Sequence, residues 1–154
     1  MPTQIEAIRG VVNACQALPN MVTGGQPTQL HLEALKAAGT AVILNIRPHA
    51  EPHPLDEPAA VTALGMEYVN VPVGGRDLND ATLDRIREVL VANRERNVFF
   101  HCASANRVGG TLIPFLMLDE GMEEEDAIEI ATRVGLRSPE LLQWALDYVR
   151  RQKG

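Results

Sequence analysis

A cysteine and an arginine stand close together in the segment FFHCASANRVGG, residues 99–110. A cysteine thiolate is a nucleophile, and a guanidinium is a planar two-pronged donor that matches the oxygens of a phosphate group. The four residues that separate Cys102 from Arg107 are small or carry a short amide: Ala103, Ser104, Ala105 and Asn106. Small side chains let backbone amides approach an anion closely. The segment therefore predicts an anion-binding loop that carries a thiolate nucleophile.

The flanking elements would place this loop at the edge of a sheet. NVFFHC, residues 97–102, is an apolar run typical of a buried strand, and residues 111–118 have a helical pattern that Pro114 should kink. Ligands of α/β sheets bind beyond the carboxyl ends of the strands. Inward loop amides, the positive end of the following helix and the charge of Arg107 would lower the pKa of Cys102 from about 8.5 to roughly 4–7. We expect Asn106 to adopt the left-handed conformation that glycine often supplies in such a loop.

The rest of the chain alternates between strand and helix patterns. Besides residues 97–102, strands are predicted near residues 21–23, at AVILNIR from residue 41 and at EYVNVPV from residue 67. Helices are predicted at 29–38, at 59–64, at ATLDRIREVLVANR with Asp80 as its cap, at EEEDAIEIATRVG and at SPELLQWALDYVRRQ. This alternation predicts a single α/β domain over residues 1–154, with a mostly parallel central sheet of four to five strands flanked by helices.

The first helix is predicted from a capping box formed by Thr3 and Glu6. An apolar stripe at helical spacing then extends to Cys15, through Ile5, Ile8 and Val12. We therefore expect Cys15 to be a core residue rather than a resolving partner for Cys102.

Composition narrows the class of partner and the compartment. The chain has 154 residues and a net charge of -6, so it lacks the general basic character that nucleic acids or anionic membranes require. No apolar run approaches the roughly 20 residues needed to span a bilayer. The N-terminus lacks the basic-then-apolar layout of a signal peptide, and two cysteines do not suggest a disulfide scaffold. We expect a cytoplasmic protein with Cys102 as a free thiol.

The pair His101-Cys102, followed by Arg107 after a strand, resembles the cysteine-dependent protein tyrosine and dual-specificity phosphatases. The order of TGGQPT, ILNIRP, LGMEYVNVPV and HCASANRVGG covers much of the chain and is similar to a bacterial family of phosphatase-like domains. Some members of that family are fused to beta-lactamase-like persulfide dioxygenases. The resemblance implies a cysteine-phosphatase-like fold and a phosphoric monoester hydrolase that needs no cofactor or metal.

The same resemblance implies a role for each residue of the segment. Cys102 would be the nucleophile, Arg107 the phosphate binder and His101 a residue that tunes the thiolate. The substrate would be a phosphorylated protein or small molecule, and a phosphate or sulfate ion would fit the same loop. That anion-binding loop would consist of Ala103, Ser104, Ala105, Asn106, Arg107 and Val108.

Three features depart from the phosphatase pattern. Phosphatases place five residues between the cysteine and the arginine, whereas this chain has four. Phosphatases usually have Ser or Thr after the arginine, whereas this chain has Val108. The usual position of the general acid is occupied by Gly74-Gly75, which leaves Asp77 as the best substitute. Loss of a positioned acid typically lowers the rate by about 10²–10⁴.

Two alternative functions therefore stay open. The four-residue spacing resembles rhodanese-type sulfurtransferases, in which the cysteine would carry a persulfide. A non-enzymatic phosphate- or sulfate-binding module would need only the anion cradle.

The remaining candidates lie at the same predicted edge of the sheet. Arg47 and Arg76 would add positive field there or serve as plain structural arginines. A loop rich in proline carries potential metal ligands, but its prolines make a helical ligand pair improbable and favour a solvated loop. These potential ligands are His49, Glu51, His53 and Asp56.

Overall fold

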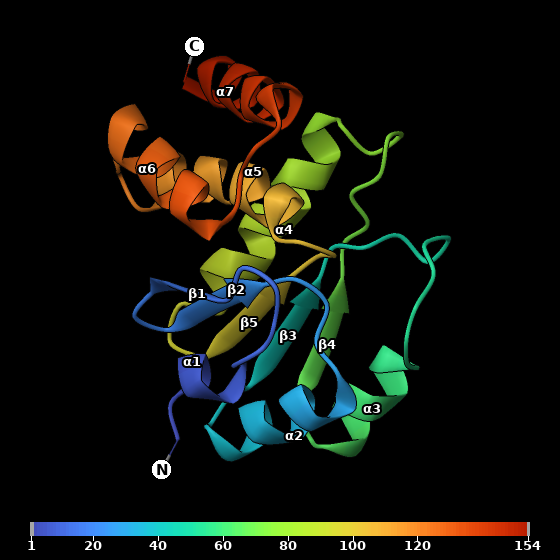
Figure 1. The fold of residues 1–154 in the computed structure, drawn as a ribbon. Helices are drawn as coiled ribbons and strands as arrows, with labels where there is room; N and C mark the ends of the chain where they lie inside the picture. Colours follow the sequence, from blue (N-terminus) through green and yellow to red (C-terminus); the bar gives the residue numbers. More distant parts are fainter. Residues whose placement is uncertain (1, 154) are drawn as a thin grey trace.

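The structure, a computed structural model, describes residues 2–153 and contains one five-stranded sheet in the order β1-β2-β5-β3-β4. The antiparallel pair is β1 with β2, and the other three pairings are parallel (Figure 1). The mostly parallel α/β sheet predicted from the sequence is thereby confirmed. The strands are β1 (Cys15–Leu18), β2 (Met21–Gly24), β3 (Val42–Asn45), β4 (Glu67–Asn70) and β5 (Val98–His101).

Helices cover both faces of the sheet (Figure 1). One face carries α1 (Gln4–Ala7), α2 (Gln29–Ala37) and α3 (Glu57–Ala63). The other carries α4 (Asp80–Ala92), α5 (Asn106–Pro114), the π-helical turn η1 (Phe115–Asp119), α6 (Glu124–Val134) and α7 (Pro139–Lys153). The hydrophobic core is accordingly divided into two clusters, one on each side of the sheet.

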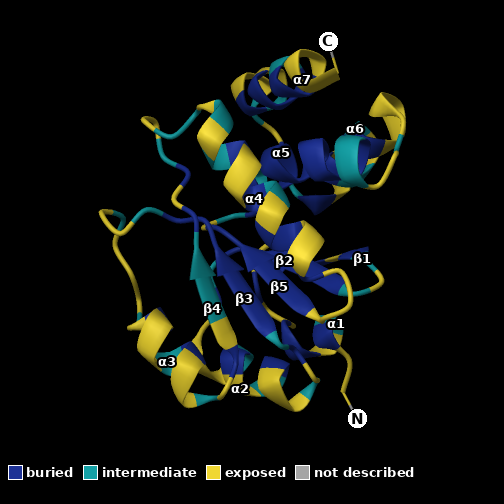
Figure 2. Ribbon diagram, turned by 180° about the vertical axis from the view of Figure 1, so that it is seen from behind, coloured by how far each residue is buried: buried dark blue, intermediate teal, exposed yellow. Residues whose placement is uncertain are grey.

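Strand β5 lies in the middle of the sheet and is buried along its whole length (Figure 2). Its side chains alternate between the two core clusters, with Phe99 on the side of α1 to α3 and Phe100 on the other side. The same alternation sends His101 and Cys102 to opposite faces. Because β2, β3 and β4 run parallel to β5, the segments that follow all four strands meet at one edge of the sheet.

The first helix is shorter than its apolar stripe predicted. The capping box of Thr3 and Glu6 is present, but α1 ends at Ala7 and Gly10 has a φ of +93°. Cys15 lies in strand β1, where it is buried, and Val12 is 58% exposed. The helical spacing of apolar residues therefore wrongly predicted that the helix continues after residue 8. The prediction that Cys15 belongs to the core is confirmed.

Two helix ends also differ in detail from the prediction. The side chain of Asn79, not Asp80, caps α4 by accepting a hydrogen bond from the Thr82 amide. Pro114 ends the regular α5 and is followed by the π-helical turn η1, in which the Glu120 amide donates to the Phe115 carbonyl. Proline lacks a donor N–H, so a break in the helical pattern is expected there.

No helix among residues 2–153 is long and apolar enough to cross a membrane.

Candidate functional site

Cys102 is the first residue after β5 and is 1% exposed. Its amide donates to the Gly24 carbonyl at 3.3 Å, which continues the pairing of β5 with β2. The Ala105 amide donates to Cys102 Sγ at 3.1 Å. An N–H donor at this distance stabilises a thiolate more than a thiol, because hydrogen bonds to the charged form favour that form. The loop thus directs at least one backbone amide at the sulfur atom.

The loop after Cys102 is held against the segment that follows β2. Gly25 forms a β-bridge with Ser104, and the Gln26 amide donates to the Ala103 carbonyl at 3.2 Å. A Cβ atom on Gly25 would lie 2.4 Å from the Ala103 oxygen, a distance that no real side chain tolerates. The second glycine of the TGGQPT motif is therefore required by the close approach of two backbones.

The left-handed residue of the loop is Ala105, with a φ of +72°, so the expectation that Asn106 would adopt this conformation was wrong. Asn106 instead begins α5, and its side-chain oxygen accepts hydrogen bonds from the amides of Arg137 and Ser138. That contact ties the loop to the start of α7. Val108 is fully buried within α5.

Arg107 extends from the first turn of α5 toward the loop after β3. Its two terminal nitrogens donate to the Glu51 carboxylate at 2.6 and 3.1 Å, and one of them also donates to the Val73 carbonyl at 3.0 Å. Burial opposes the Arg107 charge, but the hydrogen bonds to Glu51 outweigh it and raise the pKa of Arg107. The structure therefore places Cys102 and Arg107 together at the carboxyl edge of the sheet.

Glu51 also contacts the buried Arg47, whose Nε donates to it at 3.0 Å. Arg47 in turn donates to the side-chain oxygen of Gln26 at 2.6 Å, and the side-chain Nε2 of Gln26 donates to Glu57 at 2.8 Å. Glu57 pairs with His101 at 2.6 Å. A continuous polar network therefore connects His101, which precedes the cysteine, to Arg107, which follows it. Its members are Arg107, Glu51, Arg47, Gln26, Glu57 and His101.

His101 and Glu57 form a fully desolvated pair, with side chains 0% and 2% exposed. His101 Nδ1 lies 3.1 Å from the Cys102 carbonyl oxygen, and Nε2 lies 2.6 Å from a Glu57 oxygen. A carbonyl oxygen only accepts, so Nδ1 carries a proton, and the short contact to Glu57 contains a second one. Burial raises the pKa of Glu57, but the hydrogen bond and charge of His101 outweigh it and leave that pKa lowered. Glu57 is therefore a buried carboxylate that is held by its contact with His101.

The His101 ring lies on the other side of the sheet from Cys102 Sγ and stacks on Phe99 at 5.2 Å between ring centroids. Its contact with the cysteine is consequently made through the Cys102 backbone carbonyl. Any effect of His101 on the thiol acts through the position and polarisation of that peptide group.

A cavity of 290 Å³ opens beside Arg107. Asp77 does not line it, because its carboxylate turns back and accepts a hydrogen bond from the Gly74 amide at 2.9 Å. The lining includes a different carboxylate, Glu140 in the first turn of α7. The other lining residues are Glu51, Val73, Gly74, Gly75, Leu78, Arg107, Ser138 and Leu141.

The sequence did not single out Glu57, Gln26 or Glu140. Only its place in the TGGQPT motif pointed to Gln26. Glu57 lies in a segment that was interpreted as a solvated loop, so its burial was not expected. Within that segment His49, His53 and Asp56 are indeed exposed, whereas Arg47 and Glu57 are buried. Among residues 2–153 no group of three or more histidine, cysteine or acidic residues is arranged to hold a metal ion. Arg76 is exposed.

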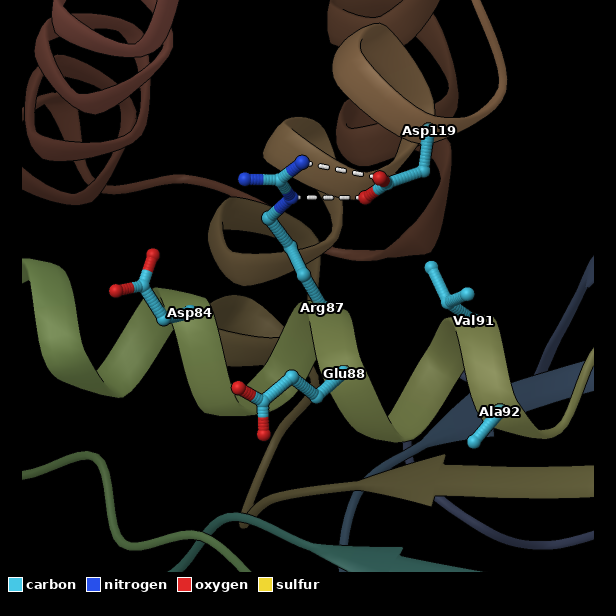
Figure 3. A pocket seen from close by; sticks show the side chains of 6 residues that line it. All are labelled: Asp84, Arg87, Glu88, Val91, Ala92 and Asp119. Atoms are coloured by element: carbon cyan, nitrogen blue, oxygen red, sulfur yellow. Dashed lines mark hydrogen bonds and ion pairs between the residues drawn. The ribbon is translucent and has the colours of Figure 1, made fainter.

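A second cavity, of 480 Å³, lies along α4 and is lined by residues from α4 and η1 (Figure 3). Its one arginine, Arg87, is bound to both carboxylate oxygens of Asp119 at 2.8 and 3.0 Å. None of its lining residues belongs to the loops after the parallel strands. The cavity is therefore separate from the site around Cys102.

Several solved structures share this fold. A DUF442 protein from Shewanella putrefaciens CN-32 matches with a TM-score of 0.79 and 22% sequence identity, over 96% of this chain and 97% of its own. TpbA from P. aeruginosa, solved as a cysteine-to-serine variant with phosphotyrosine, matches with a TM-score of 0.67 and 19% identity over 90% and 83% of the two chains. PTPMT1, solved with PI(5)P, matches with a TM-score of 0.76 and 13% identity over 91% and 96%.

This chain has the phosphatase-like fold. The resemblance to tyrosine and dual-specificity phosphatases that the sequence motifs indicated is thereby confirmed at the level of architecture. No family model matches the sequence. A beta-lactamase hydrolase-like protein from Agrobacterium fabrum is 32% identical over an alignment of 91 residues that covers 56% of this chain. The chain covers 21% of the length of that relative.

Proposed function

We propose that this chain is a cysteine-dependent phosphatase-like hydrolase, a phosphoric monoester hydrolase with Cys102 as nucleophile. The Cys102 thiolate attacks phosphorus and forms a phosphocysteine, and the bond to the leaving oxygen breaks as that oxygen takes up a proton. Water then hydrolyses the phosphocysteine and releases phosphate and the thiolate. Arg107 and the backbone amides of residues 103–108 bind the phosphoryl oxygens in both steps.

The observation that carries this proposal is the position of a buried sulfur and a guanidinium at the end of β5. The Ala105 amide donates to Cys102 Sγ at 3.1 Å, and Arg107 extends from the first turn of the helix that follows the loop. Two structures with the same fold contain phosphorylated ligands, phosphotyrosine in TpbA and PI(5)P in PTPMT1. By analogy the substrate is a phosphorylated protein or small molecule, and phosphate or sulfate ion would bind in the same loop.

The experiment is hydrolysis of an aryl phosphate, followed through release of the phenol. We expect turnover that is abolished in Cys102→Ser and lowered about 10²–10³-fold in Arg107→Ala. Cys15→Ser, which removes the other buried thiol, should keep its activity. A well-folded protein without turnover across a panel of phosphate monoesters would contradict the proposal.

Asp77 stays a weaker part of the proposal. Its hydrogen bond from the Gly74 amide occupies the carboxylate that would donate a proton to the leaving group. We propose that Asp77 assists only after the turn at Gly74 opens. Asp77→Asn should then slow turnover of a substrate with a poor leaving group while having little effect on one with a good leaving group.

A sulfurtransferase is the second candidate, and the direct hydrogen bond from the Ala105 amide to Cys102 Sγ favours it. A four-residue loop that converges on one sulfur atom would stabilise a persulfide. In this reaction the thiolate takes the outer sulfur of thiosulfate, and sulfite leaves. Intact mass measurement after incubation with thiosulfate should then show one added sulfur on wild type and none on Cys102→Ser. An anion that stabilises the fold without either reaction would instead indicate a binding module.

A reducing compartment such as the cytoplasm suits either chemistry. Both cysteines are free thiols in the structure, and Cys102 must stay so to react.

A further inference from the structure

The cavity beside Arg107 contains more negative than positive charge. Its charged lining residues are one arginine, Arg107, and two glutamates, Glu51 and Glu140. The remaining lining is apolar side chain, glycine backbone and one serine. A substrate held by Arg107 would therefore place its organic part between apolar walls, within the field of two carboxylates.

Glu51 is held in this cavity by two arginines. Its carboxylate accepts hydrogen bonds from both terminal nitrogens of Arg107, so an incoming oxyanion competes with it for the guanidinium. Glu51 retains its contact with Arg47, which is fixed by further hydrogen bonds to Gln26 and to the Pro52 carbonyl. The Glu51 carboxylate thus remains beside the bound substrate as a negative neighbour that is paired with Arg47.

We propose that Glu51 and Glu140 are specificity-determining residues, which restrict the site to phosphate esters with a single anionic group and an apolar or cationic remainder. The inference rests on the proposed function, since it assumes that Arg107 holds the phosphoryl group. At 290 Å³ the cavity lies at the lower end of the range for ligand sites, about 300–1,000 Å³. A compact substrate with one ring-sized group fits these dimensions.

The selection follows from Coulomb repulsion between like charges. A second negative group on the substrate would lie within the same small cavity as Glu140, an exposed carboxylate whose repulsion is strongest at low salt. We expect such a group to weaken binding by about tenfold at low salt. A cationic group at the same position should bind at least as well as a neutral one.

The experiment measures binding without turnover. The Cys102→Ser protein is titrated by calorimetry with three phenyl phosphates that carry a para-methyl, a para-aminomethyl or a para-carboxylate group. We expect the carboxylate compound to bind about tenfold more weakly than the methyl compound, and Glu140→Gln in the same background to remove most of that difference. Glu88→Gln, which neutralises an exposed carboxylate of the separate cavity on α4, should leave the difference unchanged.

The outcomes separate this inference from the proposed function. Equal binding of the methyl and carboxylate compounds overturns the inference, and turnover of both by wild type would leave the hydrolase intact. Discrimination that disappears in Glu140→Gln, in a protein without turnover, supports the inference and counts against the hydrolase. If none of the three compounds binds the Cys102→Ser protein more tightly than it binds an Arg107→Ala variant, both the inference and the proposed function are overturned.

Discussion

Both terminal nitrogens of Arg107 donate hydrogen bonds to the carboxylate of Glu51, at 2.6 and 3.1 Å. The predicted anion binder therefore already holds an internal anion. A carboxylate and a phosphoryl group present similar pairs of oxygens to a guanidinium, so the two compete for the same donors. We therefore expect Glu51 to lower the affinity of Arg107 for phosphate.

Replacing Glu51 by glutamine should strengthen anion binding. Glu51→Gln removes the competing charge and leaves Arg107 in place, so we expect inorganic phosphate to bind about tenfold more tightly in calorimetry at low salt. Glu67→Gln, which breaks a surface ion pair with Arg96, is the matched control and should have no effect. Weaker phosphate binding in Glu51→Gln would show instead that Glu51 orients Arg107 for the ligand.

The same competition predicts a dependence on pH. The hydrogen bond from Arg107 is the main cause that lowers the pKa of Glu51, so this carboxylate stays ionised until the solution is acidic. As the pH falls through that lowered pKa, Glu51 takes up a proton and releases Arg107. Sulfate, whose charge is constant over this range, should bind wild type more tightly as the pH falls below about 4.5, the ordinary pKa of a glutamate. Sulfate binding to Glu51→Gln should lack this rise, and a rise of the same size in both proteins would contradict the mechanism.

Glu57 is predicted to stabilise the fold through its pair with His101. Glu57→Gln removes the buried carboxylate that His101 contacts at 2.6 Å, and should cost about 2–4 kcal/mol of unfolding free energy at pH 7. Because the folded pKa of Glu57 is lowered, its contribution is complete above the unfolded value of about 4.3 and is lost as the pH falls through the folded value. The difference between wild type and variant in urea unfolding should therefore shrink below about pH 4.

The control for this measurement is Glu95→Gln, which changes an exposed carboxylate and should alter the unfolding free energy by less than about 0.5 kcal/mol. A difference between wild type and Glu57→Gln that is constant down to pH 3 would mean that Glu57 is protonated in the folded protein. Hydrolysis of an aryl phosphate by Glu57→Gln supplies a second readout, because His101, the partner of Glu57, contacts the Cys102 carbonyl.

Gly25 is predicted to be indispensable for the geometry of the loop. Its missing Cβ would lie 2.4 Å from the Ala103 oxygen, and that oxygen is fixed by the Gln26 amide. Gly25→Ala should therefore destabilise the protein by about 1–3 kcal/mol and weaken phosphate binding. Gly75→Ala is the matched control, since nothing lies within 4 Å of its added Cβ. Equal stability of the two variants in urea unfolding would contradict the close approach.

The sequence predicted the architecture because each element carries its own local signal. The alternation of apolar strands and amphipathic helices identified the α/β sheet, and the capping residue Thr3 correctly marked the start of α1. The same local reasoning overextended α1, because apolar residues happened to continue at helical spacing past Gly10. Hydrophobic spacing alone does not distinguish a helix from a turn that leads into a buried strand.

The candidate site was predictable only where its residues are neighbours in sequence. Cys102 and Arg107 belong to one loop, so their meeting follows from the strand that precedes them. The contact of Glu51 with Arg107 spans 56 positions and that of Glu57 with His101 spans 44. Such contacts depend on how the proline-rich loop folds over the sheet edge, and no local propensity encodes that path.

The ion pair between Arg87 and Asp119 is predicted to stabilise the contact between α4 and η1 without affecting the site (Figure 3). Asp119 binds the Arg87 guanidinium with two hydrogen bonds, and these bonds raise the pKa of Arg87 well above its usual value. Arg87 also donates to the Tyr148 hydroxyl of α7 at 2.9 Å. Arg87→Met breaks all three bonds and should cost about 1–3 kcal/mol in urea unfolding.

Arg85→Met is the matched control on the same helix. Arg85 is exposed and lies 3.7 Å from Glu88, so its removal should change the unfolding free energy by less than about 0.5 kcal/mol. Phosphate binding should be the same in both variants and in wild type, because none of the contacts of Arg87 involves the loops at the sheet edge. If Arg87→Met weakened phosphate binding at a temperature where it stays folded, α4 would have to be counted with α7 among the elements that position the cavity beside Arg107.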